Sequence, residues 1–263
     1  METTLITGGS SGIGLAIAKQ LAQNPCHLVL LGRSLDKLAH AKSEIAQNAH
    51  PQTLVTTISA DITNFEDLRE KLQQEVETID CLIHSAGKGL ALTFEDSALE
   101  DFHSLIQANF FGAVNISKLV LPGMKNRNRG RIVYISSVAG LLGIYGYTCY
   151  SSSKFALEGF AQSLRNELKS SNIRVSVVYP PDVDTPMLAE ENKQKPEVTK
   201  AISGGNLMTP EAVAKKIIRA TRGKKFRVIP GFGNWLNCLL IIHFPNIVFA
   251  YIDLISKRKS LSL

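Results

Sequence analysis

The stretch Thr4-Leu5-Ile6-Thr7-Gly8-Gly9-Ser10-Ser11-Gly12-Ile13-Gly14, close to the start of the chain, decides the fold. It begins with an apolar run typical of a buried strand, and the residues after Gly12 have helical periodicity. A tight turn between them needs residues without a side chain, and the free N–H groups at the start of a helix bind phosphate. Glycine-rich turns also occur for purely structural reasons. At a first strand–helix junction, however, the spacing Gly8, Gly12, Gly14 predicts a dinucleotide-binding turn.

The rest of the chain repeats this alternation of strand and helix. Short continuous apolar runs predict strands at Thr4–Ile6, Leu28–Leu31, Leu54–Ser59, Cys81–His84, Arg131–Ser136, Arg174–Val178 and Phe226–Ile229. Helical periodicity predicts helices at Gly12–Gln23, Leu35–Asn48, Phe65–Glu77, Leu99–Met124, Tyr150–Ser170 and Pro210–Thr221. Strands that are apolar on both faces and alternate with helices are typical of parallel sheets. The sequence therefore predicts a single-domain, Rossmann-like α/β fold, a doubly wound parallel sheet with helices on both faces.

Two regions depart from the alternation. Residues 180–205 are polar and hold few large apolar side chains, so we expect a long loop that is a substrate lid or is disordered. Residues 231–263 form a strongly apolar segment that ends in Lys257-Arg258-Lys259. We accordingly expect one catalytic domain over residues 1–230, including the loop, followed by a C-terminal segment.

Composition limits the function classes. The net charge of +6 is modest for 263 residues, and the basic residues form no long stripe interleaved with aromatic residues, which argues against nucleic-acid binding. The four cysteines do not have metal-ligand spacing, so we expect reduced thiols and no metal site. The N-terminus already reads as a core strand rather than a signal peptide. These features indicate a cytoplasmic protein.

Two polar residues bear on which dinucleotide is bound. Arg33 follows the second predicted strand, where enzymes that use NAD carry an acidic residue for the ribose 2′-hydroxyl. A guanidinium instead binds the 2′-phosphate of NADPH, which a carboxylate would repel. Arg33 therefore predicts NADPH, the alternative being a solvated surface arginine. Asp61 follows the third predicted strand and either binds the adenine amine or is an acidic residue at a helix start.

Tyr150-Ser151-Ser152-Ser153-Lys154 puts a tyrosine and a lysine on one face of a predicted helix. An ammonium near a phenol lowers its pKa from about 10 toward neutral pH, which suits proton donation to a ketone oxygen. Ser137, thirteen residues upstream at a strand end, can hold that oxygen as charge builds on it. Ser136 should point to the opposite face of the strand end, so we expect a structural role for it.

Asn109 lies inside the predicted helix Leu99–Met124, where asparagine is unfavourable. It is therefore frayed, satisfied by packing, or functional. In the last case a water molecule held there would relay protons from Lys154 to solvent.

Together these residues resemble the short-chain dehydrogenase/reductase family over roughly residues 3–230. The resemblance implies a catalytic tetrad of Asn109, Ser137, Tyr150 and Lys154, and a homodimer or homotetramer. It also implies that the cofactor contacts Gly8, Ser10, Ser11, Gly12, Ile13, Gly14, Arg33, Asp61, Ile62, Ala86, Gly87, Tyr150, Lys154, Pro180, Val183 and Thr185. One departure is His84-Ser85-Ala86-Gly87, where the family usually has Asn-Asn-Ala-Gly, which puts the strand-stabilising role of the asparagines in doubt.

A narrower resemblance comes from Tyr179-Pro180-Pro181-Asp182-Val183-Asp184-Thr185-Pro186 and from the run Ala189 to Pro196. These are similar to the group of 3-ketodihydrosphingosine (3-dehydrosphinganine) reductases. The resemblance implies that NADPH reduces the ketone of a long-chain sphingoid base. The alternatives are another lipophilic substrate of the same family (a steroid, a retinoid or an acyl chain) or a noncatalytic NADPH-binding sensor. A sensor would need the Gly8–Gly14 turn but not Tyr150 and Lys154.

The tail consists of two apolar pieces, Trp235–Phe244 and Ile247–Ile255, split by Pro245. Each is too short to span a bilayer, which needs about 20 helical residues. With the basic cluster Lys257-Arg258-Lys259 behind them, they suit a peripheral anchor on the cytoplasmic face of an anionic membrane. The alternative is a segment that closes the substrate pocket or packs in a subunit interface.

Overall fold

Seven parallel strands in the order β3-β2-β1-β4-β5-β6-β7 form the centre of the molecule. The computed structural model describes residues 1–203 and 207–260, without the side chains of residues 259 and 260. The strands are β1 (Glu2–Thr7), β2 (Cys26–Gly32), β3 (Leu54–Ser59), β4 (Cys81–His84), β5 (Gly130–Ile135), β6 (Ile173–Val178) and β7 (Arg227–Val228). The strand order reverses between β1 and β4, which is where doubly wound sheets bind their ligands.

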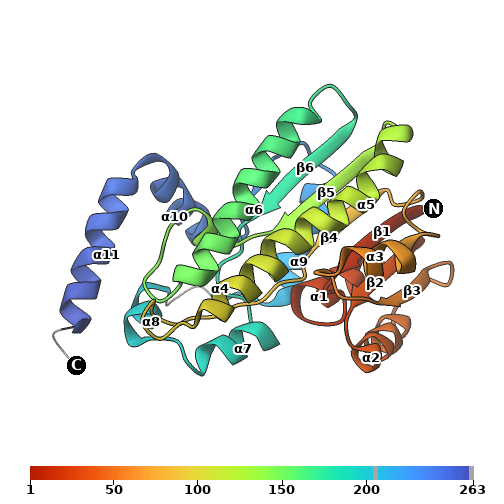
Figure 1. Cartoon of the computed structure of the whole chain (residues 1–263). Helices are drawn as coiled ribbons and strands as arrows, with labels where there is room; N and C mark the ends of the chain where they lie inside the picture. The colour runs from red at the N-terminus through yellow and green to blue at the C-terminus, as the bar shows by residue number, and fades with distance from the viewer. Residues whose placement is uncertain (204–206, 261–263) are drawn as a thin grey trace.

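Helices cover both faces of the sheet, as Figure 1 shows. They are α1 (Gly12–Leu21), α2 (Leu35–Ala46), α3 (Phe65–Leu72), α4 (Leu99–Ile106), α5 (Gly112–Asn126), α6 (Thr148–Glu167), α7 (Pro186–Asn192), α8 (Glu197–Ser203), α9 (Pro210–Thr221), α10 (Phe232–His243) and α11 (Pro245–Ser260). One core cluster contains Leu68 of α3, Val120 of α5 and Leu157 of α6. The other contains Ile17 of α1 and residues of α2 and α9. The predicted doubly wound fold is confirmed.

The predicted helix Leu99–Met124 is present as one helix, Leu99–Asn126, but it is not α-helical throughout. A π-helical turn, Gln107–Phe111, separates α4 from α5 and contains Asn109. Such single π turns lengthen the hydrogen-bonded ring by one residue and are frequent at functional sites. The helix predicted at Phe65–Glu77 extends too far, since α3 ends at Leu72.

The polar region 180–205 is not the long loop that we expected. It contains α7 and α8, and the rest of the prediction, residues 204 and 205, lies outside the described part of the chain. Thr185 begins α7 as an N-cap that accepts a hydrogen bond from the backbone of Leu188 at 3.3 Å, and Pro186 occupies the first helical turn. Thr199 of α8 is buried and donates to the carbonyl of Tyr145 at 2.7 Å. Residues 180–203 therefore form a largely helical lid at the carboxyl ends of the strands.

The tail forms α10 and α11, which meet at an angle of 110° where Pro245 starts the second helix. Cys238 of α10 is fully buried in the core, and Asn234 donates to the carbonyl of Tyr179 at 2.8 Å. Both helices lie at the opposite end of the molecule from α2 and β3 (Figure 1). By length and composition alone, this bent pair and the core helix Leu99–Asn126 are the membrane-span candidates among the described residues.

Candidate active site

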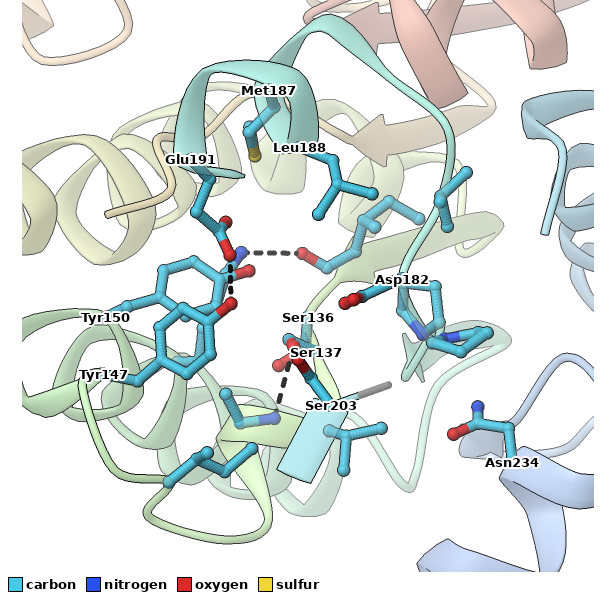
Figure 2. A pocket seen from close by; sticks show the side chains of 18 of the residues that line it. Ser136, Ser137, Tyr147, Tyr150, Asp182, Met187, Leu188, Glu191, Ser203 and Asn234 are labelled. Carbon is cyan, nitrogen blue, oxygen red and sulfur yellow. Dashed lines mark hydrogen bonds between the residues drawn. The ribbon is translucent and has the colours of Figure 1, made fainter. Parts of the chain in front are cut away.

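A cavity of about 620 Å³ opens at the carboxyl ends of the strands. The glycine turn between β1 and α1, here called the cradle, lines one side of the cavity. The ends of β5 and β6 line its floor, and α7, α8, α10 and α11 lie on the remaining sides. Figure 2 shows Tyr150, Ser137 and Glu191 pointing toward this space. Of the predicted site residues it gathers Gly8, Ser11, Gly12, Ile13, Ala86, Gly87, Ser137, Tyr150, Lys154, Pro180, Val183 and Thr185.

The glycine turn is built so closely that side chains would not fit. Gly8 has a φ of 68°, and a Cβ there would lie 2.9 Å from the backbone of Ala86. A Cβ on Gly14 would lie 2.3 Å from the carbonyl oxygen of Gly8. The close approach brings the first turn of α1 against the end of β4, so both border the same cavity.

The start of α1 is left open for an anion. Its N-cap, Ser11, makes no side-chain cap, and the first turn carries no acidic residue. The side chains of Ser34, Asn64, Thr185 and Thr209 cap α2, α3, α7 and α9, whereas α6 and α10, like α1, begin without a side-chain cap. Free N–H groups at a helix start together with an uncharged, glycine-lined wall fit the pyrophosphate of a dinucleotide.

His84 takes over a connecting role at the end of β4. Its Nδ1 lies 2.9 Å from the hydroxyl of Thr7, and that hydroxyl accepts a hydrogen bond from the backbone of Ala86 at 3.2 Å. Burial lowers the pKa of His84 to about 3, so the ring is neutral. The Thr7–His84 pair thus links β1 to β4 and holds the Ala86–Gly87 backbone without the family's asparagines.

Tyr150 and Lys154 lie one helical turn apart at the N-terminal end of α6. The Nζ of Lys154 is 5.6 Å from the centroid of the Tyr150 ring and donates to the carbonyl of Ile135 at 3.1 Å. Ser137 follows β5, and its hydroxyl accepts a hydrogen bond from the backbone of Ala139 at 3.2 Å. The arrangement brings a phenol, an ammonium and a hydroxyl to one wall of the cavity.

The protein's own groups hold Tyr150 as a neutral phenol. Burial raises its pKa, the carboxylates of Glu191 and Asp182 raise it further, and the hydrogen bond from Ser137 acts in the opposite direction. The expected lowering of the tyrosine pKa is therefore wrong for the protein alone. A protonated phenol is nevertheless the form that a proton donor requires. Burial lowers the pKa of Lys154 to about 8.

Asn109 is satisfied entirely by hydrogen bonds within the protein. Its Nδ2 donates to the carbonyl of Lys88 at 3.0 Å and to the hydroxyl of Ser153 at 2.8 Å. Its Oδ1 accepts from the backbone N–H of Lys88 at 2.8 Å. The side chain thus ties the loop after Gly87 to α6, which positions Lys154 and the cofactor side of the cavity. The proton relay stays a prediction.

Other predicted cofactor residues lie outside the cavity lining. Arg33 follows β2 with an exposed side chain that makes no ion pair with the described residues. Asp61 follows β3, and its Oδ1 accepts hydrogen bonds from the backbone and hydroxyl of Thr63, as expected of an acid at a turn. Ile62 is buried, and Ser10 lies in the turn near Gly32. Ser136, by contrast, belongs to the cavity lining together with Ser137, so it does not lie on the opposite side as expected. It is buried, and its hydroxyl has no hydrogen-bond partner among the described residues.

A family comparison agrees with this geometry. The model of the short chain dehydrogenase family matches residues 2–196. The chain belongs to the short-chain dehydrogenase family. It is accordingly an oxidoreductase, and the predicted enzyme class is confirmed.

Two relatives and one solved structure show which short-chain dehydrogenases this chain resembles. A 3-ketodihydrosphingosine reductase of Bos taurus is 42% identical over 221 residues, which cover 82% of this chain and 67% of that protein. One of Dictyostelium discoideum is 36% identical over 270 residues, 95% of this chain and 81% of that protein. A short-chain dehydrogenase from Sphingobium yanoikuyae, solved in complex with NADPH, has the same fold (TM-score 0.78, 23% identity, 100% of this chain and 95% of that one).

Sequence reasoning missed several residues of this short-chain dehydrogenase site. Tyr147 is buried, and its ring centroid lies 5.4 Å from that of Tyr150. Its hydroxyl donates to Glu191 of α7 (Figure 2). Asp182 and Asn234 also line the cavity. The sequence offered the lid and the pocket-closing tail only as alternatives, so it did not show which of their side chains would reach the cavity.

Proposed function

We propose that this enzyme reduces the ketone of 3-ketodihydrosphingosine (3-dehydrosphinganine) to sphinganine with NADPH as the hydride donor. The observation that carries the proposal is a cavity that is lined by Tyr150 and Ser137, by the glycine turn and, from the lid and tail, by many apolar residues. Relatives that cover most of the chain and are named 3-ketodihydrosphingosine reductase support the choice of substrate.

The cofactor site would use the features already described. The free start of α1 would hold the pyrophosphate, Arg33 the 2′-phosphate, and Ala86 and Gly87 the nicotinamide side. Lys154 would bind the nicotinamide ribose. NADPH bound there supplies a hydride for the ketone carbon. Thr185 of the lid packs near Gly12, since a Cβ on Gly12 would lie 3.1 Å from the Thr185 methyl group. The lid therefore packs directly against the glycine turn at the start of α1.

The protein supplies the proton and the oxygen contacts. Ser137 donates to the ketone oxygen and stabilises its developing negative charge. Tyr150 gives its proton to that oxygen, and its neutral form is maintained by burial. Lys154 lies close enough to the ring to stabilise the phenolate left behind.

A long alkyl chain would occupy the apolar part of the cavity. The lid contributes Met187, Leu188 and Ile202, and the tail contributes Leu240, Ile241, Ile247, Val248 and Ile252. Burial of apolar surface stabilises each chain methylene by about 0.8 kcal/mol. A short polar ketone would gain none of this.

The test is NADPH oxidation by the purified enzyme with 3-ketodihydrosphingosine, compared with a ketosteroid, a retinal and a simple long-chain ketone. We expect the highest kcat/KM with 3-ketodihydrosphingosine. A clear preference for a steroid or a retinoid would replace this substrate by the alternative one. Tight NADPH binding without turnover of any ketone would favour the noncatalytic sensor.

The proposal also includes peripheral contact with the cytoplasmic face of a membrane through α10 and α11. Exposed apolar side chains on these helices include Trp235 (43% exposed), Phe249 (46%) and Leu254 (48%), none of which lines the cavity. Tail residues on the other side line the substrate cavity, so a lipid ketone would enter from the surface that the tail contacts. Lys257 and Arg258 add positive charge next to this face.

Point substitutions test the membrane contact better than truncation, because truncation would open the cavity. Phe249→Ser together with Leu254→Ser should reduce co-sedimentation with anionic liposomes several-fold while the fold is kept. Leu54→Ser, at an exposed position on β3, is the matched control. Liposome binding by the double variant equal to that of the control would refute the anchor.

The predicted homodimer or homotetramer would use the helices α4, α5 and α6. Phe111 (42% exposed) and Phe155 (45%) lie on this helical layer and support that choice. Light scattering should give a mass of two or four chains, and Phe155→Lys should lower it. A monomeric wild type would contradict this part of the proposal.

A further inference from the structure

Two acidic residues line the catalytic end of the cavity and transfer neither the hydride nor the proton, although their charge raises the pKa of Tyr150. They are Asp182, in the loop after β6, and Glu191, on α7. Tyr147, whose ring lies beside that of Tyr150 at an angle of 47°, donates a hydrogen bond to Glu191. Figure 2 shows Asp182 and Glu191 among the side chains around the space that Ser137 and Tyr150 face. They therefore lie near the position where the ketone would bind.

The charges at this wall are not balanced. Lys195 lies between the carboxylates, with its Nζ 3.3 Å from Glu191 Oε1 and 3.6 Å from Asp182 Oδ2. Two carboxylates share this one ammonium, which leaves one negative charge. The cation of the described cavity lining, Lys154, donates to the Ile135 carbonyl and pairs with neither carboxylate.

The lysine approaches from the protein side, while Asp182 and Glu191 line the cavity. Glu191 Oε2 lies beside Gly89, where a Cβ would be 2.6 Å away. The Lys195 side chain is 2% exposed, is absent from the described lining, and lies 5.8 Å from the centroid of the Tyr147 ring. One oxygen of each carboxylate, Asp182 Oδ1 and Glu191 Oε2, accepts no hydrogen bond from the described residues. Acceptors without a donor next to a surplus negative charge fit a cationic group of a ligand.

We propose that Glu191 and Asp182 bind the ammonium group on the carbon next to the substrate ketone and so select amino ketones over plain ketones. The inference rests on the proposed function, in which Tyr150 and Ser137 hold the ketone oxygen. With that oxygen fixed, a substituent on the neighbouring carbon lies within one or two bonds of the reacting centre. An ammonium has three N–H donors, enough for both free carboxylate oxygens.

The experiment compares two substrates in four proteins. The substrates are 3-ketodihydrosphingosine and the same ketone with hydrogen in place of the amino group. The proteins are the wild type, Glu191→Gln, Asp182→Asn and Glu190→Gln. Glu190 is the matched control, because it neighbours Glu191 on α7 but points to solvent and pairs with Lys193. The measured quantity is the ratio of kcat/KM for the amino ketone to that for the plain ketone.

We expect the wild type and Glu190→Gln to prefer the amino ketone about 10- to 100-fold, the range for hydrogen bonds to charged groups. Glu191→Gln and Asp182→Asn should reduce this preference about tenfold, with less than threefold change for the plain ketone. An equal loss on both ketones would show that Glu191 only holds α7 in place, and would overturn the inference while leaving the proposed function intact. If Glu191→Gln does not fold, the unchanged preference of Asp182→Asn overturns it. A wild type that reduces neither ketone refutes the proposed function and the inference together.

Discussion

Replacing Lys154 by methionine should make the protein more stable and inactive. Lys154 is 6% exposed, and burial lowers its pKa from 10.5 to about 8. A shift of that size means that burying the charged lysine destabilises the fold by about 3 kcal/mol at pH 7. Methionine removes this charge but leaves the Ile135 carbonyl without its donor, which costs about 1 kcal/mol. The net gain is about 2 kcal/mol, or about 5 °C in Tm.

The pH dependence identifies the cause. In the wild type the penalty is fully present below pH 8, where the lysine is charged in both the folded and the unfolded chain. It fades as the pH rises from about 8 to 10.5, because the folded protein then releases its proton while the unfolded chain keeps it. The advantage of Lys154→Met should therefore be largest at pH 7 and almost gone near pH 10.5.

The assay is thermal unfolding of both proteins at pH 7 and pH 10 without added cofactor. Lys118→Met, at an exposed lysine on α5, is the control and should change stability by less than about 0.5 kcal/mol at either pH. If Lys154→Met is destabilised equally at both values, the charge of Lys154 is not a burden on the fold, and the reasoning is refuted.

Two further substitutions test the cofactor site. Gly14→Ala puts a Cβ 2.3 Å from the Gly8 carbonyl oxygen and should abolish NADPH binding measured by nicotinamide fluorescence; Gly143→Ala, with open space around its Cβ, should bind as the wild type does. Wild-type affinity of Gly14→Ala would contradict the close-packed turn. Arg33→Ala should lower the kcat/KM ratio of NADPH to NADH about tenfold or more, since it removes a charge-assisted contact with the 2′-phosphate. An unchanged ratio would leave Arg33 a surface residue.

The sheet could be predicted because its signal is local. Buried parallel strands such as Leu28–Leu31 are continuous apolar runs, and the glycine turn marks where the first of them meets a helix. The proximity of Tyr150, Lys154 and Ser137 could be predicted for the same reason: the first two lie on one helix, and Ser137 follows a strand. Their proximity in space then depends only on the parallel order of the strands.

The lid and its chemistry could not be predicted, since they depend on contacts between distant segments. α7 and α8 are seven residues each, too short for a helical period to appear among polar side chains. Their stability comes from Thr185 at the start of α7 and from Thr199 bonded to the loop before α6. The predicted direction of the Tyr150 pKa shift is wrong for a similar reason. Burial and the carboxylate of Glu191, which raise this pKa, come from outside its own helix.

The most direct test of the proposed reaction follows the hydride from NADPH into the product. NADPH labelled with deuterium at the transferred position of the nicotinamide is mixed with 3-ketodihydrosphingosine, and the product is examined by mass spectrometry. We expect the wild type to form sphinganine with one deuterium on carbon 3. Tyr150→Phe should form the same product about 100- to 10,000-fold more slowly, the range for loss of a general acid. Sphinganine without deuterium, or an equal rate with Tyr150→Phe, would contradict the proposed reaction.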